Sequence, residues 1–323
     1  MPPINYERRF FFVMIQFPHR HILSINQLTT QDIAFILDTA DSLKEILDRP
    51  IKKVPTLRGR TVVHLFFEPS TRTRLSFELA AKRLSADTVS VSASTSSVVK
   101  GETLIDTARN IEAMKPDIVI MRHFCSGAPH LIANKINASV INAGDGMNEH
   151  PTQALLDLMS VREKKGGFKG LKVVIVGDIK HSRVAHSDIL AFNKMGALVT
   201  VCGPATLIPR DIERLGARLE LDIDKALDGA DVIIALRIQK ERQGKVLVPS
   251  IREYSIRYGI NKKRVKLASK DVLIMHPGPI NRGVEMTPDV ADATNSIILD
   301  QVTNGVAVRM ALLVLLLSGE NYR

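Results

Sequence analysis

The most chemically suggestive segment of the sequence is the run Ser70, Thr71, Arg72 and Thr73, which lies between an apolar strand-like stretch and a helical pattern. The first turn of a helix presents free backbone N–H groups and the positive end of the helix dipole. Hydroxyl groups and a guanidinium at that position create a site for phosphate. An ordinary helix cap beside solvated arginines explains the same run equally well. The chain has no GxxxxGKS or GxxxxGKT pattern, so this is not a Walker A loop.

Two further segments could act on a bound anion. The Ser-rich loop at 94–103 contains Lys100 and could close over an anion, although a flexible surface loop is the better interpretation of this segment alone. His150 precedes Pro151 at the start of a predicted helix, where the dipole favours the neutral imidazole. A neutral imidazole can donate a hydrogen bond to a carbonyl oxygen. A capping or structural role is nevertheless more common for such a histidine.

Two arginines at predicted strand ends suit the binding of carboxylates. Arg183 follows the stretch VVIVGD, and Arg237 follows VIIAL, although either arginine could also form a surface ion pair. Gly177 after a strand invites a dinucleotide reading, but the GxGxxG spacing is missing, which argues against a nicotinamide dehydrogenase. With the phosphate site, these arginines suggest that a phosphorylated acyl donor is joined to a substrate with several carboxylates. No Ser-His-Asp or Cys-His set suggests a covalent intermediate.

The sequence predicts neither a metal nor a cofactor. The nine histidines form no HExxH pattern, and His181 and His186 lie near no obvious set of carboxylates. Cys125 and Cys202 are far apart and outside any CxxC motif. Isolated cysteines suit a reducing compartment, so we expect a cytoplasmic protein.

Alternating strand-like runs and helical patterns must position these residues. A helix is predicted over 30–47, and the strand candidates form two series: 61–67, 88–91, 117–121 and 139–142, then 172–176, 198–202, 231–236 and 272–275. Short apolar runs separated by helices predict parallel βαβ units with both sheet faces covered. The segment 164–167 is the predicted boundary between two α/β domains, each with a doubly wound parallel sheet. Ligands are then expected at the carboxyl ends of the strands, in a cleft between the domains.

Length and composition agree with this architecture. The chain has 323 residues, and single cores stop growing near about 250–300 residues. The net charge of +10 favours anionic partners, but the chain has no tryptophan and only 5% aromatic residues, which argues against a nucleic-acid partner. The apolar runs 10–17 and 306–317 are too short to span a membrane, so no membrane association is expected. We expect the second run, which contains Arg309, to form a buried helix.

Seven sequence blocks, in order from about His21 to the C-terminus, closely resemble the family of aspartate carbamoyltransferase catalytic chains. The blocks are FFEPSTRTRLSFE, KGETLIDTARN, MRH, NAGDGMNEHPTQALLDL, GDIKHSRVAHS, LRIQKER and MHPGPINRGVEM. The resemblance implies transfer of a carbamoyl group from carbamoyl phosphate to the amine of L-aspartate, an early step of de novo pyrimidine biosynthesis. It also implies a homotrimer with shared active sites, in some members within a larger assembly with regulatory chains or a dihydroorotase.

The same resemblance implies a domain plan. Residues 21–150 would bind carbamoyl phosphate and residues 151–302 would bind aspartate, with a C-terminal helix at 303–323 packing back on the first domain. Residues 1–20 have no counterpart in the family and are taken as an N-terminal extension, with Met14 as an alternative start.

Roles for individual residues follow from the matching motifs, again as implications of the resemblance. The phosphate would be held by Ser70, Thr71, Arg72 and Thr73. The carbamoyl group would be held by Arg122, His150 and Gln153, with Arg122 also reaching the phosphate. Aspartate would be held by Arg183, Arg237 and Gln239. Ser96, at the carbamoyl phosphate, and Lys100, in catalysis and aspartate binding, would come from the neighbouring subunit. Pro277 and Gly278 would place backbone carbonyls near the reacting amine.

The chain departs from the family pattern at two positions. Glu149 stands beside His150 where the best-known members have glutamine, and Gly278 replaces a leucine found in some members. The loop spacing also leaves either Ser96 or Ser97 as the contributing hydroxyl.

Two alternative functions are consistent with parts of the sequence. Ornithine carbamoyltransferases share the STRTR and HPTQ blocks, but they have an HCLP block and a Ser-Met-Gly loop, both of which this chain lacks. Arg237 would also repel the ornithine ammonium group and attract the side-chain carboxylate of aspartate. A non-enzymatic basic binding protein would leave the strand-end arginines unexplained.

Overall fold

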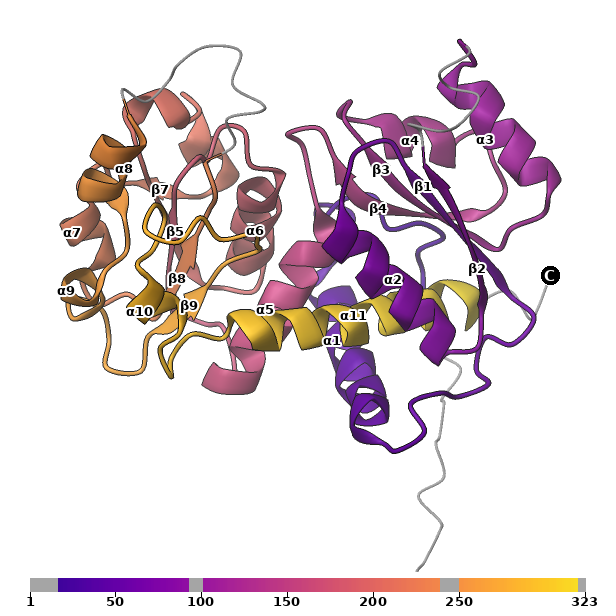
Figure 1. Cartoon of the computed structure of the whole chain (residues 1–323), viewed down its shortest axis with the longest axis horizontal. Coiled ribbons are helices and arrows are strands. Elements are labelled where there is room, and N and C mark those ends of the chain that lie inside the picture. The colour runs from indigo at the N-terminus through magenta and orange to yellow at the C-terminus, as the bar shows by residue number, and fades with distance from the viewer. Residues whose placement is uncertain (1–16, 93–100, 239–249, 319–323) are drawn as a thin grey trace, which may run out of the picture.

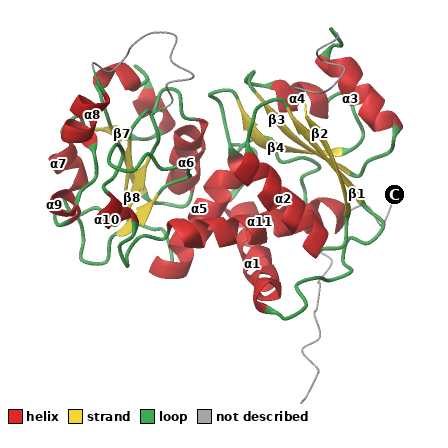
Figure 2. Ribbon diagram, viewed as in Figure 1, coloured by secondary structure: helices red, strands yellow, loops and turns green. Residues whose placement is uncertain are grey.

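Two parallel β-sheets, each with helices on both faces, form the scaffold of the protein (Figures 1 and 2). The computed structural model describes residues 17–92, 101–238 and 250–318. The first sheet has the strand order β2-β1-β3-β4 and consists of β1 (Thr61–Phe66), β2 (Asp87–Ser92), β3 (Ile118–His123) and β4 (Ser139–Asp145). The second has the order β7-β6-β5-β8-β9 and consists of β5 (Lys172–Val176), β6 (Leu198–Cys202), β7 (Arg218–Leu219), β8 (Val232–Ala235) and β9 (Leu273–Met275). The predicted α/β fold with two doubly wound parallel sheets is confirmed.

The eight predicted strands all form, and their ends differ from the prediction by three residues at most. The prediction missed the edge strand β7, which has two residues and pairs only with β6. Such a short, half-exposed strand carries no apolar run that a sequence pattern could detect.

Alternating side chains of each strand point into different cores, which explains the continuous apolar runs. On the first sheet, Val62 and Phe66 lie in the larger core, whereas Val63 and Leu65 pack toward α3 and α4. The larger core continues under the inner face of the second sheet, so one hydrophobic cluster spans both halves of the molecule. A strand buried on both faces needs apolar residues at every position.

Helices connect the strands. Those of the first half are α1 (Thr30–Lys44), α2 (Thr71–Arg83), α3 (Leu104–Ala113), α4 (Ala128–Ala133) and α5 (Pro151–Lys165). Those of the second half are α6 (Arg183–Lys194), α7 (Ile223–Leu227), α8 (Ile251–Tyr258), α9 (Lys262–Val265) and α10 (Pro288–Ala291). Short 3₁₀ turns occur at Glu45–Asp48, Ala205–Leu207 and Ile212–Leu215. The helix predicted over 30–47 therefore ends at Lys44 and tightens into a 3₁₀ turn. The predicted boundary at 164–167 lies at the end of α5.

The C-terminal helix α11 (Ile298–Ser318) packs against α1, α2 and α5 of the first half (Figure 1). It is longer than the predicted run, and by length and hydropathy it could cross a membrane, the one such helix in the described part of the chain. However, 78% of its most apolar window is buried inside the protein, as in the core helix of a globular domain. Arg309 is buried as well: its guanidinium lies 4.9 Å from the centre of the Phe77 ring and donates to Ser76 Oγ. The predicted buried helix is confirmed.

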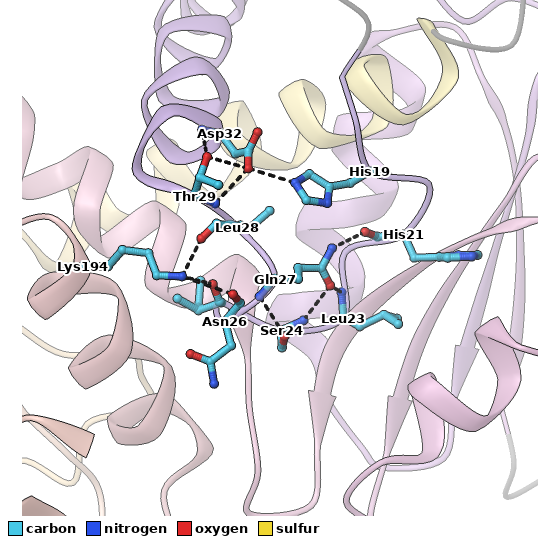
Figure 3. A network of polar contacts seen from close by, with 11 residues as sticks. His19, His21, Leu23, Ser24, Asn26, Gln27, Leu28, Thr29, Asp32 and Lys194 are labelled. Carbon is cyan, nitrogen blue, oxygen red and sulfur yellow. Dashed lines mark hydrogen bonds and ion pairs between the residues drawn. The ribbon is translucent and has the colours of Figure 1, made fainter. Parts of the chain in front are cut away.

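The segment before α1 ties the two halves together (Figure 3). Ile22 pairs with β4 through hydrogen bonds to Val140 and Asn142. At the end of α6, Lys194 Nζ donates to the backbone carbonyls of Ile25, Asn26 and Leu28. A lysine of the second half therefore holds a loop that is attached to the first sheet.

Candidate active site

The predicted site residues gather where the strand order of each sheet reverses. In the first sheet the chain leaves β1 toward β2 and later returns to β3 on the other side, and in the second sheet β5 is flanked by β6 and β8 in the same way. Such switch points open a crevice outside the carboxyl ends of the two diverging strands. Ser70 follows β1, Arg122 is the second-to-last residue of β3, Arg183 follows β5 and Arg237 follows β8. The topology alone therefore brings these four residues to the two ligand-binding positions.

The start of α2 is open toward a ligand. Ser70 caps the helix with φ −157° and ψ 86°, but its side chain makes no capping hydrogen bond. The first backbone bond of this turn runs from Arg74 N to Ser70 O, so the N–H groups of Thr71, Arg72 and Thr73 have no acceptor within the helix. This geometry suits a phosphate group at the helix start.

Arg72 meets the second half of the molecule at this point. A Cβ atom on Gly278 would lie 3.3 Å from Arg72 Nε, which means that the guanidinium lies against the Gly278 backbone. Burial and the positive charge of Arg237 lower the pKa of Arg72. Arg72, Gly278 and Arg237 are therefore neighbours, although they come from both sheets.

Arg122 lies beside the same helix start. Its Nη1 is 3.5 Å from Thr73 Oγ1 and donates to Ala143 O at 3.2 Å, and its Nε is 3.3 Å from Glu68 Oε2. The arginine is thus held at the end of β3 and directed toward Thr73. It can reach a group bound at the α2 start.

His150 caps α5, as the sequence predicts for a residue before Pro151. It is buried, its backbone N–H donates to Ser187 Oγ at 2.8 Å, and its Nδ1 lies 3.5 Å from Thr152 Oγ1. Ser187 also donates to Glu149 Oε2, which accepts the backbone N–H of Ile25. Glu149, the departure from the family pattern, is therefore part of the hydrogen-bonded support of His150. Burial raises the pKa of its carboxyl group.

Arg183 is 2% exposed and forms the first residue of α6. Its Nη2 pairs with Glu68 Oε2 at 2.5 Å, so one carboxylate oxygen connects Arg183 on the second half with Arg122 on the first. Its Nη1 is buried and has no hydrogen-bond partner among the described residues. An unpaired buried guanidinium N–H is costly, and a bound carboxylate would satisfy it.

Comparison with known proteins identifies the family of the chain. The family model of the carbamoyl-P binding domain of aspartate/ornithine carbamoyltransferase matches residues 20–163, and that of the Asp/Orn binding domain matches residues 169–316. The chain belongs to the aspartate/ornithine carbamoyltransferase family. The aspartate carbamoyltransferase catalytic subunit of Desulforapulum autotrophicum is 64% identical over 305 residues, which cover 94% of this chain and 98% of that protein. The corresponding subunit of Syntrophotalea carbinolica is 63% identical over 304 residues, which cover 94% of this chain and 97% of that subunit.

Solved structures of carbamoyltransferases have the same fold. Ornithine carbamoyltransferase from Pyrococcus furiosus superposes with a TM-score of 0.83 at 34% identity and covers 92% of this chain and 96% of its own. Aspartate transcarbamoylase from Trypanosoma cruzi, in complex with N-(phosphonacetyl)-L-aspartic acid, superposes with a TM-score of 0.82 at 30% identity. The match covers 91% of this chain and 94% of the Trypanosoma cruzi chain.

Two carbamoyltransferase site residues were missed by sequence reasoning. Glu68 lies two residues after the end of β1 and is separated from Ser70 by Pro69, and a charged residue just after an apolar strand was the pattern that could have identified it. His276 in the HPGP block was also overlooked: it is buried, and its Nδ1 accepts the Gly278 N–H at 2.8 Å. Burial, Arg72 and Arg237 lower the pKa of His276 to about 3, so it stays neutral and fixes the turn that holds Gly278 against Arg72.

Four candidates for the carbamoyltransferase site, namely Ser96, Ser97, Lys100 and Gln239, lie outside the described residues. Pro277 follows His276 in the described turn. Across residues 17–92, 101–238 and 250–318, no group of three or more His, Cys, Asp or Glu side chains could hold a metal ion.

Gly144→Ala should weaken aspartate binding by this carbamoyltransferase more than it weakens binding of the phosphorylated donor. Gly144 has φ +114°, and a Cβ atom there would lie 3.0 Å from Arg183 Nε and 3.1 Å from its Cζ. Because the buried guanidinium must shift, we expect KM for aspartate to rise roughly tenfold or more, as for a lost charge-assisted hydrogen bond. Steady-state kinetics with each substrate varied in turn measures the effect.

Gly166→Ala is the matched control. Gly166 also has a positive φ, +77°, but it lies at the end of α5 and a Cβ atom there would meet nothing within 4 Å. This variant should cost stability through backbone strain and leave KM for aspartate unchanged. Equal kinetic effects of the two variants would contradict the contact between Gly144 and Arg183.

Proposed function

We propose that the chain is an aspartate carbamoyltransferase catalytic subunit, which transfers the carbamoyl group of carbamoyl phosphate to the amine of L-aspartate. The products are N-carbamoyl-L-aspartate and phosphate. The observation that carries the proposal is the contact of Glu68 with both Arg122 and Arg183, since it joins the donor-binding and carboxylate-binding parts into one site. The relatives at 63–64% identity that bear this name support aspartate as the acceptor.

The donor would bind at the start of α2. Ser70, Thr71 and Thr73, with Arg72, offer hydroxyl, backbone and guanidinium donors to the phosphate. Arg122, His150 and Thr73 would donate to the carbonyl oxygen and stabilise the negative charge that develops on it during attack. Gln153 would hold the carbamoyl nitrogen.

The acceptor would bind through its two carboxylates. Arg183 and Arg237, with Gln239, would hold them, and the Pro277 and Gly278 carbonyls would face the amine. The uncharged amine attacks the carbamoyl carbon, a C–N bond forms and the C–O bond to phosphate breaks. The departing phosphate takes the amine proton. Much of the rate acceleration would come from two effects: the two bound carboxylates orient the amine, and water is excluded from the site.

The charge around the acceptor position favours aspartate over ornithine. Burial and the positive charge of Arg237 lower the pKa of Arg72, and burial together with the charges of Arg72 and Arg237 lowers the pKa of His276. An ornithine side-chain ammonium there would meet like charge, whereas the aspartate side-chain carboxylate would be attracted. The bacterial aspartate carbamoyltransferase subunits are 63–64% identical to this chain, compared with 34% for the Pyrococcus furiosus ornithine enzyme and 30% for the Trypanosoma cruzi aspartate enzyme, so the support for aspartate comes from the bacterial subunits.

We further propose that residues 21–150 bind carbamoyl phosphate, residues 151–302 bind aspartate, and the chain forms a cytoplasmic homotrimer for pyrimidine biosynthesis. Each site would receive Ser96 and Lys100 from a neighbour. Exposed apolar side chains on α2 and the edge strand β2, which contact each other, support association at this edge: Leu75, Leu79 and Val89. The segment 93–100 follows β2, the strand of the first sheet farthest from β4.

The purified chain should form N-carbamoyl-L-aspartate from carbamoyl phosphate and L-aspartate, and it should do so after exhaustive EDTA treatment because the donors named above are all protein groups. With L-ornithine in place of aspartate, kcat/KM should be lower by at least about 100-fold, as expected when a charged substrate group meets like charge. Product analysis by mass spectrometry measures both rates. Preference for ornithine, or loss of turnover on chelation, would overturn the proposal.

A further inference from the structure

A buried polar cluster joins the helix that begins after His150 to α6 and α11. Its members are Gln153 and Asp157 on α5, Asp188 on α6 and Gln301 on α11, each 8% exposed or less. Gln153 Nε2 lies 3.1 Å from Asp157 Oδ1 and 3.3 Å from Oδ2, and Gln301 Nε2 lies 2.6 Å from Oδ1. Asp157 therefore accepts hydrogen bonds from two side-chain amides in the interior.

Asp157 and Asp188 share one proton. Burial raises the pKa of both carboxyl groups, and the charge of Asp157 raises that of Asp188 further. Two ionised carboxylates in contact repel, so such a pair retains a proton. We assign the proton to Asp188, because Asp157 accepts from two amides and lies near the positive charge of Arg309, whereas no group among the described residues donates to either Asp188 oxygen.

An ionised Asp157 determines which end of the Gln153 amide is available to a ligand. A carboxylate only accepts hydrogen bonds, so the amide must turn its NH₂ group toward Asp157. Asp157 lies one helical turn after Gln153, away from the helix start. The carbonyl Oε1 of Gln153 therefore points toward the start of α5, where His150 lies. A carbonyl oxygen can accept a hydrogen bond from an N–H group of a ligand but forms no hydrogen bond with a methyl group.

We propose that Asp157 is a positioning residue that makes the site selective for an acyl phosphate bearing an amino group, by holding the Gln153 carbonyl oxygen toward the carbamoyl nitrogen. The inference rests on the proposed function, in which Gln153 contacts the carbamoyl group. Asp157 itself touches no substrate. Asp188 donates its hydroxyl proton to Asp157 from α6, the helix that begins with Arg183, and so connects the two halves of the site.

Acetyl phosphate is the probe that isolates this effect, because it carries a methyl group where carbamoyl phosphate has an amino group and is otherwise alike. In Asp157→Asn the amide of Gln153 is no longer fixed. The dissociation constant of carbamoyl phosphate should then rise roughly 10-fold to 100-fold, as when a polar ligand group loses its partner. That of acetyl phosphate should change less than about threefold, since its phosphate and carbonyl contacts remain. Titration calorimetry measures both constants.

Asp188→Asn and Ser160→Ala are matched controls. An asparagine at 188 keeps a neutral donor toward Asp157. Ser160 is as deeply buried on α5, but its hydroxyl bonds to Leu156 O and accepts from Asn304, away from Gln153. Both variants should keep the ratio of the two dissociation constants within about twofold of the wild type. If Asp157→Asn left the ratio of the two dissociation constants unchanged, whether or not both ligands bound more weakly, Asp157 would have only a structural role and the proposal would be wrong.

Two further tests separate the causes of failure. In a Gln153→Ala background, Asp157→Asn should change the ratio no further, because it acts through Gln153, and an additive effect would contradict the proposal. If Asp157→Asn does not fold, a crystal structure of the wild type with carbamoyl phosphate decides: the carbamoyl nitrogen must lie within hydrogen-bond distance of Gln153 Oε1, and any other placement overturns the proposal. A wild type that binds carbamoyl phosphate but does not transfer it to aspartate would instead refute the proposed function.

Discussion

His150→Ala is expected to lower kcat by roughly 10²–10³, the usual effect of removing one donor that stabilises an oxyanion. His150 is buried at the start of α5, its backbone N–H is held by Ser187, which bonds to Glu149, and its imidazole Nδ1 lies 3.5 Å from Thr152 Oγ1. Carbamoyl phosphate affinity should change much less, because the phosphate contacts at Ser70–Thr73 remain. Single-turnover kinetics, together with the dissociation constant of carbamoyl phosphate, separates the two effects.

His130→Ala is the control for this experiment. His130 lies on α4, on the face of the first sheet opposite the larger core, and should leave kcat unchanged. If His150→Ala also kept the wild-type kcat, the imidazole would have no part in the mechanism.

The second large effect concerns sites shared between subunits. Lys100→Ala would spoil the loop that a subunit donates, and Arg72→Ala would spoil the subunit's own phosphate site, so each homotrimer should be nearly inactive. In a closed ring, every mixed trimer has one interface between an intact phosphate site and an intact loop. Random assembly makes about three-quarters of the trimers mixed, and each restores about one site in three. Unfolding and refolding equal amounts together should therefore recover roughly a quarter of the refolded wild-type activity.

Native mass spectrometry must first establish that mixed trimers have formed. If they have, and activity nevertheless stays at the level of the unmixed variants, Lys100 and Arg72 serve the same subunit. That result would contradict the shared site.

The strand-end residues could be predicted because parallel strands end at one edge of a sheet. An apolar run followed by polar residues is enough to predict that Arg122 and Arg183 lie at the carboxyl ends of strands. Glu68 and His276 could not be assigned in this way, because their roles depend on partners from distant segments. Glu68 bonds to arginines 54 and 115 positions further along the chain, and His276 is neutral because of burial beside Arg72 and Arg237.

The extent of α11 was underestimated for a related reason. The predicted run began at 306 because Gln301 and Asn304 interrupt the apolar pattern, yet both are buried. Gln301 donates to Asp157 and accepts the backbone N–H of His276, and Asn304 donates to Ser160 and Glu163, so both amide NH₂ groups are paired inside the protein, whereas Asn304 Oδ1 has no partner among the described residues. Hydropathy measures the cost of burying an unpaired amide, and the partners that remove this cost are more than 140 residues away along the chain.

We expect a phosphate site on the first sheet and a carboxylate site on the second to act as a single substrate-binding site. Binding of N-(phosphonacetyl)-L-aspartic acid, which carries a phosphonate and two carboxylates in one molecule, tests it most directly by calorimetry. We expect one molecule per chain, bound at least roughly 10³-fold tighter than inorganic phosphate, since linking the two groups makes the second contact intramolecular. Arg72→Ala and Arg183→Met should each weaken binding by more than about tenfold. Binding no tighter than that of phosphate, or binding that either substitution leaves unchanged, would contradict a single site built from both sheets.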